Sequence, residues 1–244
     1  MKNSQSIKEV FKVFQNREEY FEKLNQKHYS GKLVVNQVIV IIGFTFLYGI
    51  VMGSYNSVLQ AFVTGVKVPV LFTLSILICF PAFFVIQYIL GSKLAFIQMT
   101  GIILSGFVFI SSIMISFAPI VVFFLITGNN YAFLKLLHVA IFIFSGLFGV
   151  KTIIEALKYS CEAKNVYPKI GLNIFKFWVV ILAFVGMQLA WNLRPFLGDK
   201  LRPFELFRER EGNFYLAVIQ SFKQLFITTA NTPVKTNETN NTEN

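Results

Sequence analysis

Acidic residues are missing from the middle half of this chain. The sequence has 244 residues, and neither Asp nor Glu occurs anywhere from Gly31 to Ile154. Proton- and cation-coupled transporters often place carboxylates inside the membrane, and intramembrane metal sites and proteases need acidic or histidine clusters. The sequence offers these mechanisms almost no residues, so coupled ion transport and metal-dependent catalysis are disfavoured.

Cysteines and catalytic motifs are also scarce. Cys79 lies in an apolar run and Cys161 in a polar stretch, and the chain has no other cysteine. Their spacing matches neither a disulfide framework nor a metal site. The sequence also lacks a nucleophile elbow, a phosphate-binding loop and paired catalytic carboxylates. We therefore predict no enzymatic activity, no cofactor and no metal.

Apolar residues take the place that charged residues leave. Hydrophobic residues make up 55% of the chain, 29 residues are Phe, and only 14% are charged. A bilayer core about 30 Å thick needs about 20 apolar residues per helix. Five runs reach this length, and they predict an all-α, integral membrane bundle of five transmembrane helices. The predicted spans cover about residues 34–52, 68–90, 96–117, 132–154 and 174–193.

Prolines and glycines predict the shape of several spans. Pro81 removes a backbone donor inside the second span, so a kink is expected there. At Pro119 the third helix either ends or continues with a kink as far as residue 127, and the kink is the favoured interpretation. Gly49 and Gly53 form a small-xxx-small pattern that lets two helices approach closely. The uncharged connection 54–66 is compatible with a short interfacial helix.

Basic residues predict the orientation. Twelve Lys and Arg lie before the first span, in the turn between the second and third, and between the fourth and fifth. The other two connections hold only Lys67 and Lys135. The positive-inside rule therefore places the amino terminus in the cytoplasm, and we expect a bacterial inner (plasma) membrane. The net charge of +10 then indicates the lipid bilayer as a partner, and no nucleic acid.

The first 33 residues are predicted to carry a cytoplasmic amphipathic helix over 6–28. Its apolar positions recur at helical spacing, Ser6 and Glu9 match a capping box, and Glu19 with Lys23 forms an i,i+4 pair. Such a helix packs on the membrane surface or on its own bundle. A docking site for a soluble partner is the alternative. The apolar positions are Ile7, Val10, Phe11, Phe14, Phe21 and Leu24.

The segment 194–230 is predicted to be an interfacial cap followed by an amphipathic helix. Arg-Pro-Phe occurs twice, from Arg194 and from Arg202, and both copies are expected to be turns that stop the fifth helix at the interface. A lid or partner-binding surface is the alternative function. A sixth crossing through 213–230 is disfavoured because polar residues fill its middle. The tail 231–244 is expected to be disordered. The candidate interface residues are Trp191, Asn192, Arg194, Arg202, Glu205 and Arg208.

Polar side chains within the spans have a structural and a functional interpretation. Amide and imidazole groups commonly bond one membrane helix to another, and Glu155 is expected to pair with Lys151. The alternative is that they line a path for a solute. The candidate intramembrane contacts are Gln87, Gln98, His138 and Gln188.

The text from Tyr88 to Met99, YILGSKLAFIQM, resembles the short turn and the start of the third span in bacterial members of the Yip family of small multi-pass membrane proteins. The resemblance covers roughly residues 55–195 and implies five closely spaced spans. In the eukaryotic branch it implies adaptors that engage small GTPases during membrane traffic. This chain departs from that branch after the fifth span, so a GTPase partner is not carried over.

These features favour a non-enzymatic scaffold or accessory subunit that binds a membrane-protein partner or forms a homo-oligomer. The alternative is a transporter or channel for a neutral or lipid-like solute. A third hypothesis is a lipid-modifying enzyme that uses His138 or the arginine-rich segment at headgroup depth.

Overall fold

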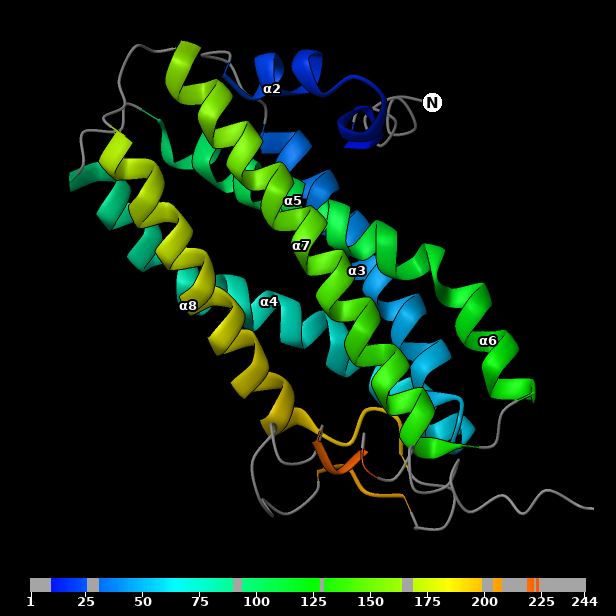
Figure 1. Ribbon diagram of the computed structural model, residues 1–244. Coiled ribbons are helices and arrows are strands. Elements are labelled where there is room, and N and C mark those ends of the chain that lie inside the picture. The colour runs from blue at the N-terminus through cyan, green and yellow to red at the C-terminus, as the bar shows by residue number, and fades with distance from the viewer. Residues whose placement is uncertain are drawn as a thin grey trace, which may run out of the picture.

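The computed structural model describes residues 10–25, 31–89, 94–127, 130–163, 169–198, 204–207, 219–221 and 223. Every regular element in these residues is a helix, and five helical runs are long and apolar enough to cross a membrane (Figure 1). The predicted all-α bundle of five spans is therefore confirmed. The spanning elements are α3 (Gly31–Gly53), α4 (Val58–Ile89), α5 (Phe96–Ser116) with α6 (Ala118–Thr127), α7 (Tyr131–Ala163) and α8 (Lys169–Leu193).

The centre of the bundle is α5. All of its residues from 101 to 109 are buried, because α3 and α7 pack along its sides. The helix α4 pairs with α3 and carries α8 on its other side, where the Trp178 indole donates to the Cys79 carbonyl at 3.1 Å. Only 17% of the most apolar stretch of α8 is buried inside the protein, so this helix lies at the edge of the bundle (Figure 1).

Glycines allow two close helix crossings. A Cβ added at Gly49 would come within 2.6 Å of the Thr64 carbonyl, so α3 and α4 touch through backbone as the small-xxx-small pattern predicts. The crossing of α5 and α7 is reciprocal. A Cβ at Gly106 would lie 2.8 Å from the Gly149 carbonyl, and one at Gly149 would lie 2.8 Å from the Gly106 carbonyl. Both crossings exclude any larger residue at these positions.

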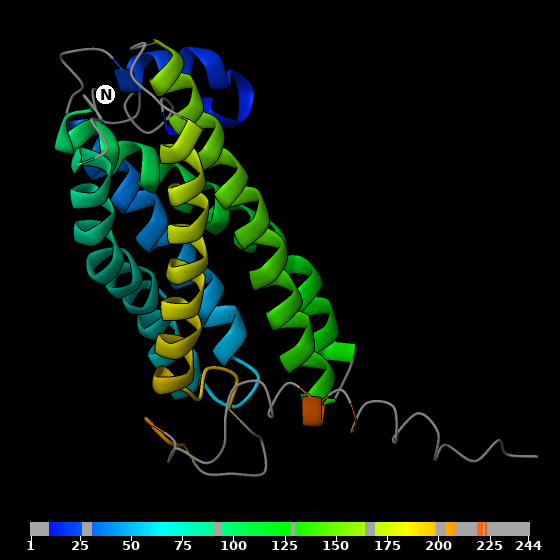
Figure 2. The same ribbon diagram turned by 60° about the vertical axis from the view of Figure 1, so that its left-hand side comes forward.

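Prolines bend the helices without ending the spans. The third span breaks between α5 and α6 at Phe117, two residues before Pro119, and then continues to Thr127. The predicted kink is confirmed. In α4, Pro69 and Pro81 both lie inside the helix, which bends along its length in Figure 2.

The second span begins ten residues earlier than predicted. Residues 58–67 are the first part of α4, so a separate interfacial helix in the connection 54–66 is wrong. The Ser57 hydroxyl accepts the backbone N–H of Gln60 at 3.2 Å, which caps the helix at this earlier point. The helix then has 32 residues, about twelve more than a bilayer core requires.

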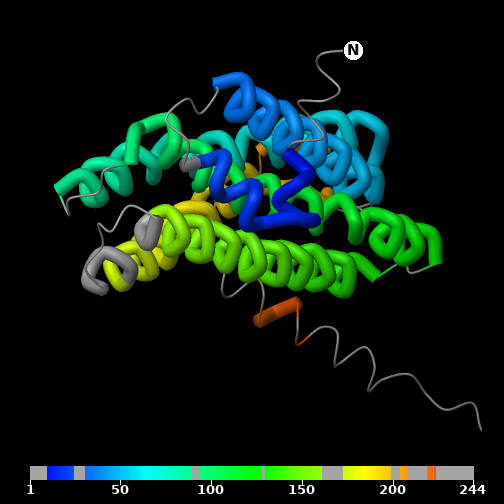
Figure 3. Tube along the Cα trace, turned by 90° about the horizontal axis from the view of Figure 1, so that it is seen from above, coloured from blue at the N-terminus to red at the C-terminus, as the bar shows by residue number. Residues whose placement is uncertain are grey.

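The amino-terminal helix is interrupted. Residues 10–15 are helical, Asn16 is not, and α2 follows from Arg17 to Asn25. The single amphipathic helix predicted over 6–28 is thus not confirmed, and its Ser6–Glu9 capping box lies outside the described residues. We call residues 10–25 the platform, because they lie across one end of the bundle (Figure 3). Its inward side chains Val10, Val13, Tyr20, Phe21 and Leu24 are all buried.

Candidate functional site

The segment after α8 folds back onto the first part of α4. We call residues 194–198 and 204–207 the cap; they lie at the opposite end of the bundle from the platform (Figure 1). The helix α8 ends at Leu193, directly before the first Arg-Pro-Phe copy, so the predicted stop is confirmed there. In the second copy, Arg202 and Pro203 lie outside the described residues and Phe204 is exposed.

Three polar side chains on one stripe of α4 hold the cap. The Gln60 amide donates to the Pro195 carbonyl at 3.1 Å, and the Thr64 hydroxyl donates to the Phe196 carbonyl at 2.7 Å. The Lys67 ammonium donates to the carbonyls of Pro195, at 3.2 Å, and Leu206. Because all the acceptors are backbone carbonyls, the side chains of α4 determine where the cap sits.

Lys67 is buried rather than exposed in a connection. Only 5% of its surface is accessible, and its ammonium lies 4.9 Å from the centre of the Phe207 ring. None of the described carboxylates pairs with it. Among the described residues, the charge is therefore balanced only by carbonyl dipoles and an aromatic face.

A glycine allows the cap to approach α4 closely. Gly198 has a φ of 64°, and a Cβ added to it would lie 2.8 Å from Cβ of Asn56. A side chain at this position would be strained, would collide with Asn56 in the turn before α4, and would press on Gln60 of α4. The carbonyls of the cap reach the donors of α4 only because this turn has no side chain.

The predicted interface residues divide into three groups. Arg194 stacks on Trp191, with its Cζ 3.6 Å from the ring centre. Asn192 is exposed beside them, and Glu205 is half-buried within the cap. Arg202 and Arg208 lie outside the described residues.

The four predicted intramembrane contacts are not brought together. His138 on α7 pairs its Nδ1 with the Tyr48 hydroxyl of α3 at 2.8 Å, and both side chains are buried. Gln98 accepts the backbone N–H of Ala95 at 3.2 Å and so caps the start of α5. Gln188 is exposed on α8.

Gln87 is fully buried, and neither amide atom has a hydrogen-bond partner. With Gln98 it lies toward the platform end, three residues or fewer from a helix terminus, whereas His138 and Gln188 lie toward the cap end. None of the four hydrogen-bonds another. Two of the four residues thus lie toward each end of the bundle.

The platform is fastened to the bundle by a buried polar link. The Gln37 amide of α3 lies 2.5 Å from the Tyr20 hydroxyl and donates to the Gly101 carbonyl of α5 at 3.0 Å. Tyr20 and Gln37 are 1% and 0% exposed, and burial raises the pKa of Tyr20. One side chain thus joins the platform to the first and central spans.

An ion pair adds a second link. The Arg17 guanidinium donates to the Glu155 carboxylate of α7 at 2.6 Å and lies over the Phe109 ring at 5.3 Å. The predicted partner of Glu155, Lys151, is 3.9 Å away and so is the weaker contact. Arg17 and Glu155 are 138 residues apart, so only the fold brings them together.

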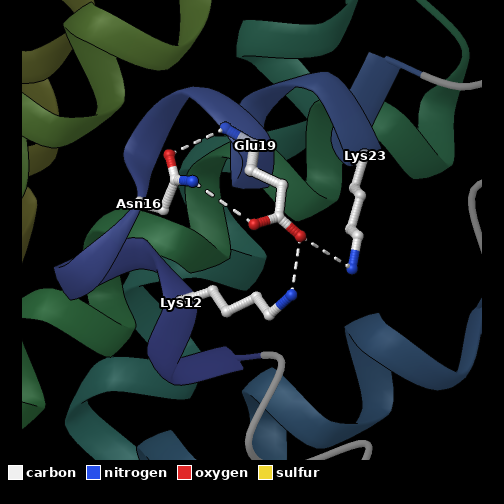
Figure 4. A network of polar contacts seen from close by, with 4 residues as sticks. All are labelled: Lys12, Asn16, Glu19 and Lys23. Carbon is white, nitrogen blue, oxygen red and sulfur yellow. Dashed lines mark hydrogen bonds and ion pairs between the residues drawn. The ribbon is translucent and has the colours of Figure 1, made fainter.

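The joint within the platform is held by four polar residues (Figure 4). The side-chain oxygen Oδ1 of Asn16 accepts the backbone N–H of Glu19 at 3.4 Å, and the Glu19 carboxylate accepts from the Asn16 side-chain amide at 3.3 Å. Lys12 reaches the same carboxylate at 2.6 Å and Lys23 at 3.5 Å. The Lys12 bond is the main reason that the pKa of Glu19 lies below its usual range. The predicted Glu19–Lys23 pair is confirmed.

The sequence contained a signal for the stripe under the cap. Gln60, Thr64 and Lys67 recur at i, i+4 and i+7, which is one face of a helix. Interpretation of residues 54–66 as a connection concealed this spacing. The partner carbonyls had no signal, because any residue supplies a carbonyl.

The described residues define a multi-pass helical membrane protein. No group of three His, Cys, Asp or Glu that could hold a metal ion occurs among them. Comparison with protein-family models, with curated proteins and with solved structures gives no match. The resemblance to the Yip family accordingly stays a prediction.

Proposed function

We propose that this protein is a non-enzymatic scaffold or accessory subunit of a complex in a bacterial inner membrane, with the platform in the cytoplasm. The observation that carries the proposal is the platform itself. Two contacts fasten it to three spans, Tyr20–Gln37–Gly101 and Arg17–Glu155. Because the platform is fixed to the spans, a protein bound to it is held in a defined position relative to the bundle.

The outward face of the platform supports a protein contact. Gln15, Asn16, Glu18 and Glu22 are exposed, and neither Glu18 nor Glu22 forms an ion pair with a described residue. These carboxylates are four residues apart on one helix face, where like charges weakly destabilise the helix. An acidic outer face suits a basic surface of another protein better than an anionic lipid surface.

The experiment is affinity purification of the full chain from its native membrane in mild detergent, followed by mass spectrometry. A partner recovered in constant stoichiometry is expected, and the Glu18→Ala, Glu22→Ala double variant should lose at least half of it. Lys158→Ala, which removes an exposed charge from α7 at the same end, is the matched control and should retain the partner. Recovery of the protein alone, or equal recovery from all three, would overturn the proposal.

A further inference from the structure

The stripe beneath the cap has the chemistry of an anion site. Gln60, Thr64 and Lys67 are 1%, 0% and 5% exposed, and an amide, a hydroxyl and an ammonium donate into one small region. Such donors bind phosphate oxygens, and the ammonium adds the charge. Buried side chains from a rigid helix make this a built site rather than a surface cluster.

The carbonyls of the cap fill this site without neutralising it. A buried ammonium is costly unless an opposite charge accompanies it. Lys67 has contacts with the Pro195 and Leu206 carbonyls and the Phe207 ring, and none of these carries a full negative charge. An anion in their place would satisfy the same donors and supply the missing charge.

The position of the site favours a phospholipid as the source of the anion. The cap is irregular backbone, which the hydrocarbon region excludes unless protein buries it, and Leu206 and Phe207 are 50% and 59% exposed. The cap therefore lies at the membrane–water boundary. Phe62, Val66 and Val70 are exposed on α4 beside the stripe, where they offer an apolar surface to acyl chains.

We propose that Gln60, Thr64 and Lys67 bind the phosphate group of an anionic phospholipid, and that this lipid displaces the cap from α4. The two occupants exclude each other because the cap carbonyls use the same donors. Gly198 already lies against Asn56, so the cap has no room to move closer to α4 and share the donors with a lipid. Binding of the lipid opens the cap, and closure of the cap releases the lipid.

The test is hydrogen exchange of the full chain in nanodiscs of phosphatidylcholine with and without phosphatidylglycerol. The peptide that contains Phe196 and Leu197 is expected to exchange about tenfold faster with phosphatidylglycerol, a typical coupling between linked sites. Lys67→Met should show one rate in both lipids. Lys135→Met removes a lysine near the start of α7, and it should respond as the wild type does.

Further arms keep the outcome decisive. Lys67→Arg retains a cation and should respond, and Thr64→Val, which removes one donor at nearly constant volume, should respond less than the wild type. Equal exchange of the wild type in both lipids, or a Lys67→Met variant that still responds, would overturn the proposal. Inorganic phosphate is added to phosphatidylcholine nanodiscs as a last arm, and opening there would overturn the lipid as the ligand.

Discussion

At the scale of single residues, the crossing of α5 and α7 depends on two glycines. The variants Gly106→Ala and Gly149→Ala each introduce a Cβ that would lie 2.8 Å from a backbone carbonyl and 2.2 Å from an isoleucine side chain. Overpacking of this kind costs about 1–3 kcal/mol. We expect the free energy of unfolding of each variant in detergent to be lower by this amount, measured by thermal or denaturant unfolding.

The same helix supplies the control. A Cβ at Gly146 would have nothing within 4 Å, so Gly146→Ala should change stability by no more than about 0.5 kcal/mol. Equal destabilisation at Gly146 and Gly149 would contradict the close crossing as the cause.

At the scale of elements, the helix α2 depends on its N-cap residue, Asn16. Replacement of an N-cap asparagine by alanine costs about 1 kcal/mol. We expect Asn16→Ala to lower the protection of α2 amides by this amount in hydrogen exchange, because Glu19 loses both of its bonds with residue 16. Asn16→Asp keeps a capping oxygen and should retain most of the protection. An equal loss in both variants would contradict the role of Asn16 as the N-cap residue of α2.

The Glu19 carboxylate makes the platform sensitive to acid. Its pKa is lowered in the folded chain from the ordinary value of 4.5, first by the Lys12 hydrogen bond. A depressed pKa contributes stability above the unfolded value, and this contribution is lost as the pH falls through the folded value. Exchange of α2 amides, corrected for intrinsic rates, should therefore accelerate below about pH 4.5, whereas Glu19→Gln, which cannot ionise, should show no such step.

At the scale of the whole molecule, an odd number of spans puts the two termini on opposite sides of the membrane. The five described spans and the distribution of Lys and Arg predict a cytoplasmic amino terminus and an external carboxyl terminus. In a bacterial host we expect fluorescence from green fluorescent protein fused to the amino terminus and activity from alkaline phosphatase fused to the carboxyl terminus. Fluorescence from a carboxyl-terminal fusion would instead indicate a sixth crossing.

The apolar runs of the sequence were sufficient to predict the helical bundle. A bilayer offers no hydrogen bonds, so an apolar run of about 20 residues has to form a helix, whatever its neighbours are. The kink near Pro119 and the close approach at Gly49 were predictable for a similarly local reason, because each follows from the geometry of a single residue. The boundary of α4 was not, since residues 54–66 have no charge to separate connection from helix.

What the sequence by itself determined is the number of spans, their kinks and the scarcity of catalytic groups in the middle of the chain. Only the tertiary structure decided which polar groups meet. Arg17 forms an ion pair with Glu155, and Gln37 hydrogen-bonds both Tyr20 and Gly101. Lys67 is buried and donates to the cap. These contacts link residues far apart in the chain, often through a backbone carbonyl that any residue supplies, so no pattern in the sequence specifies them.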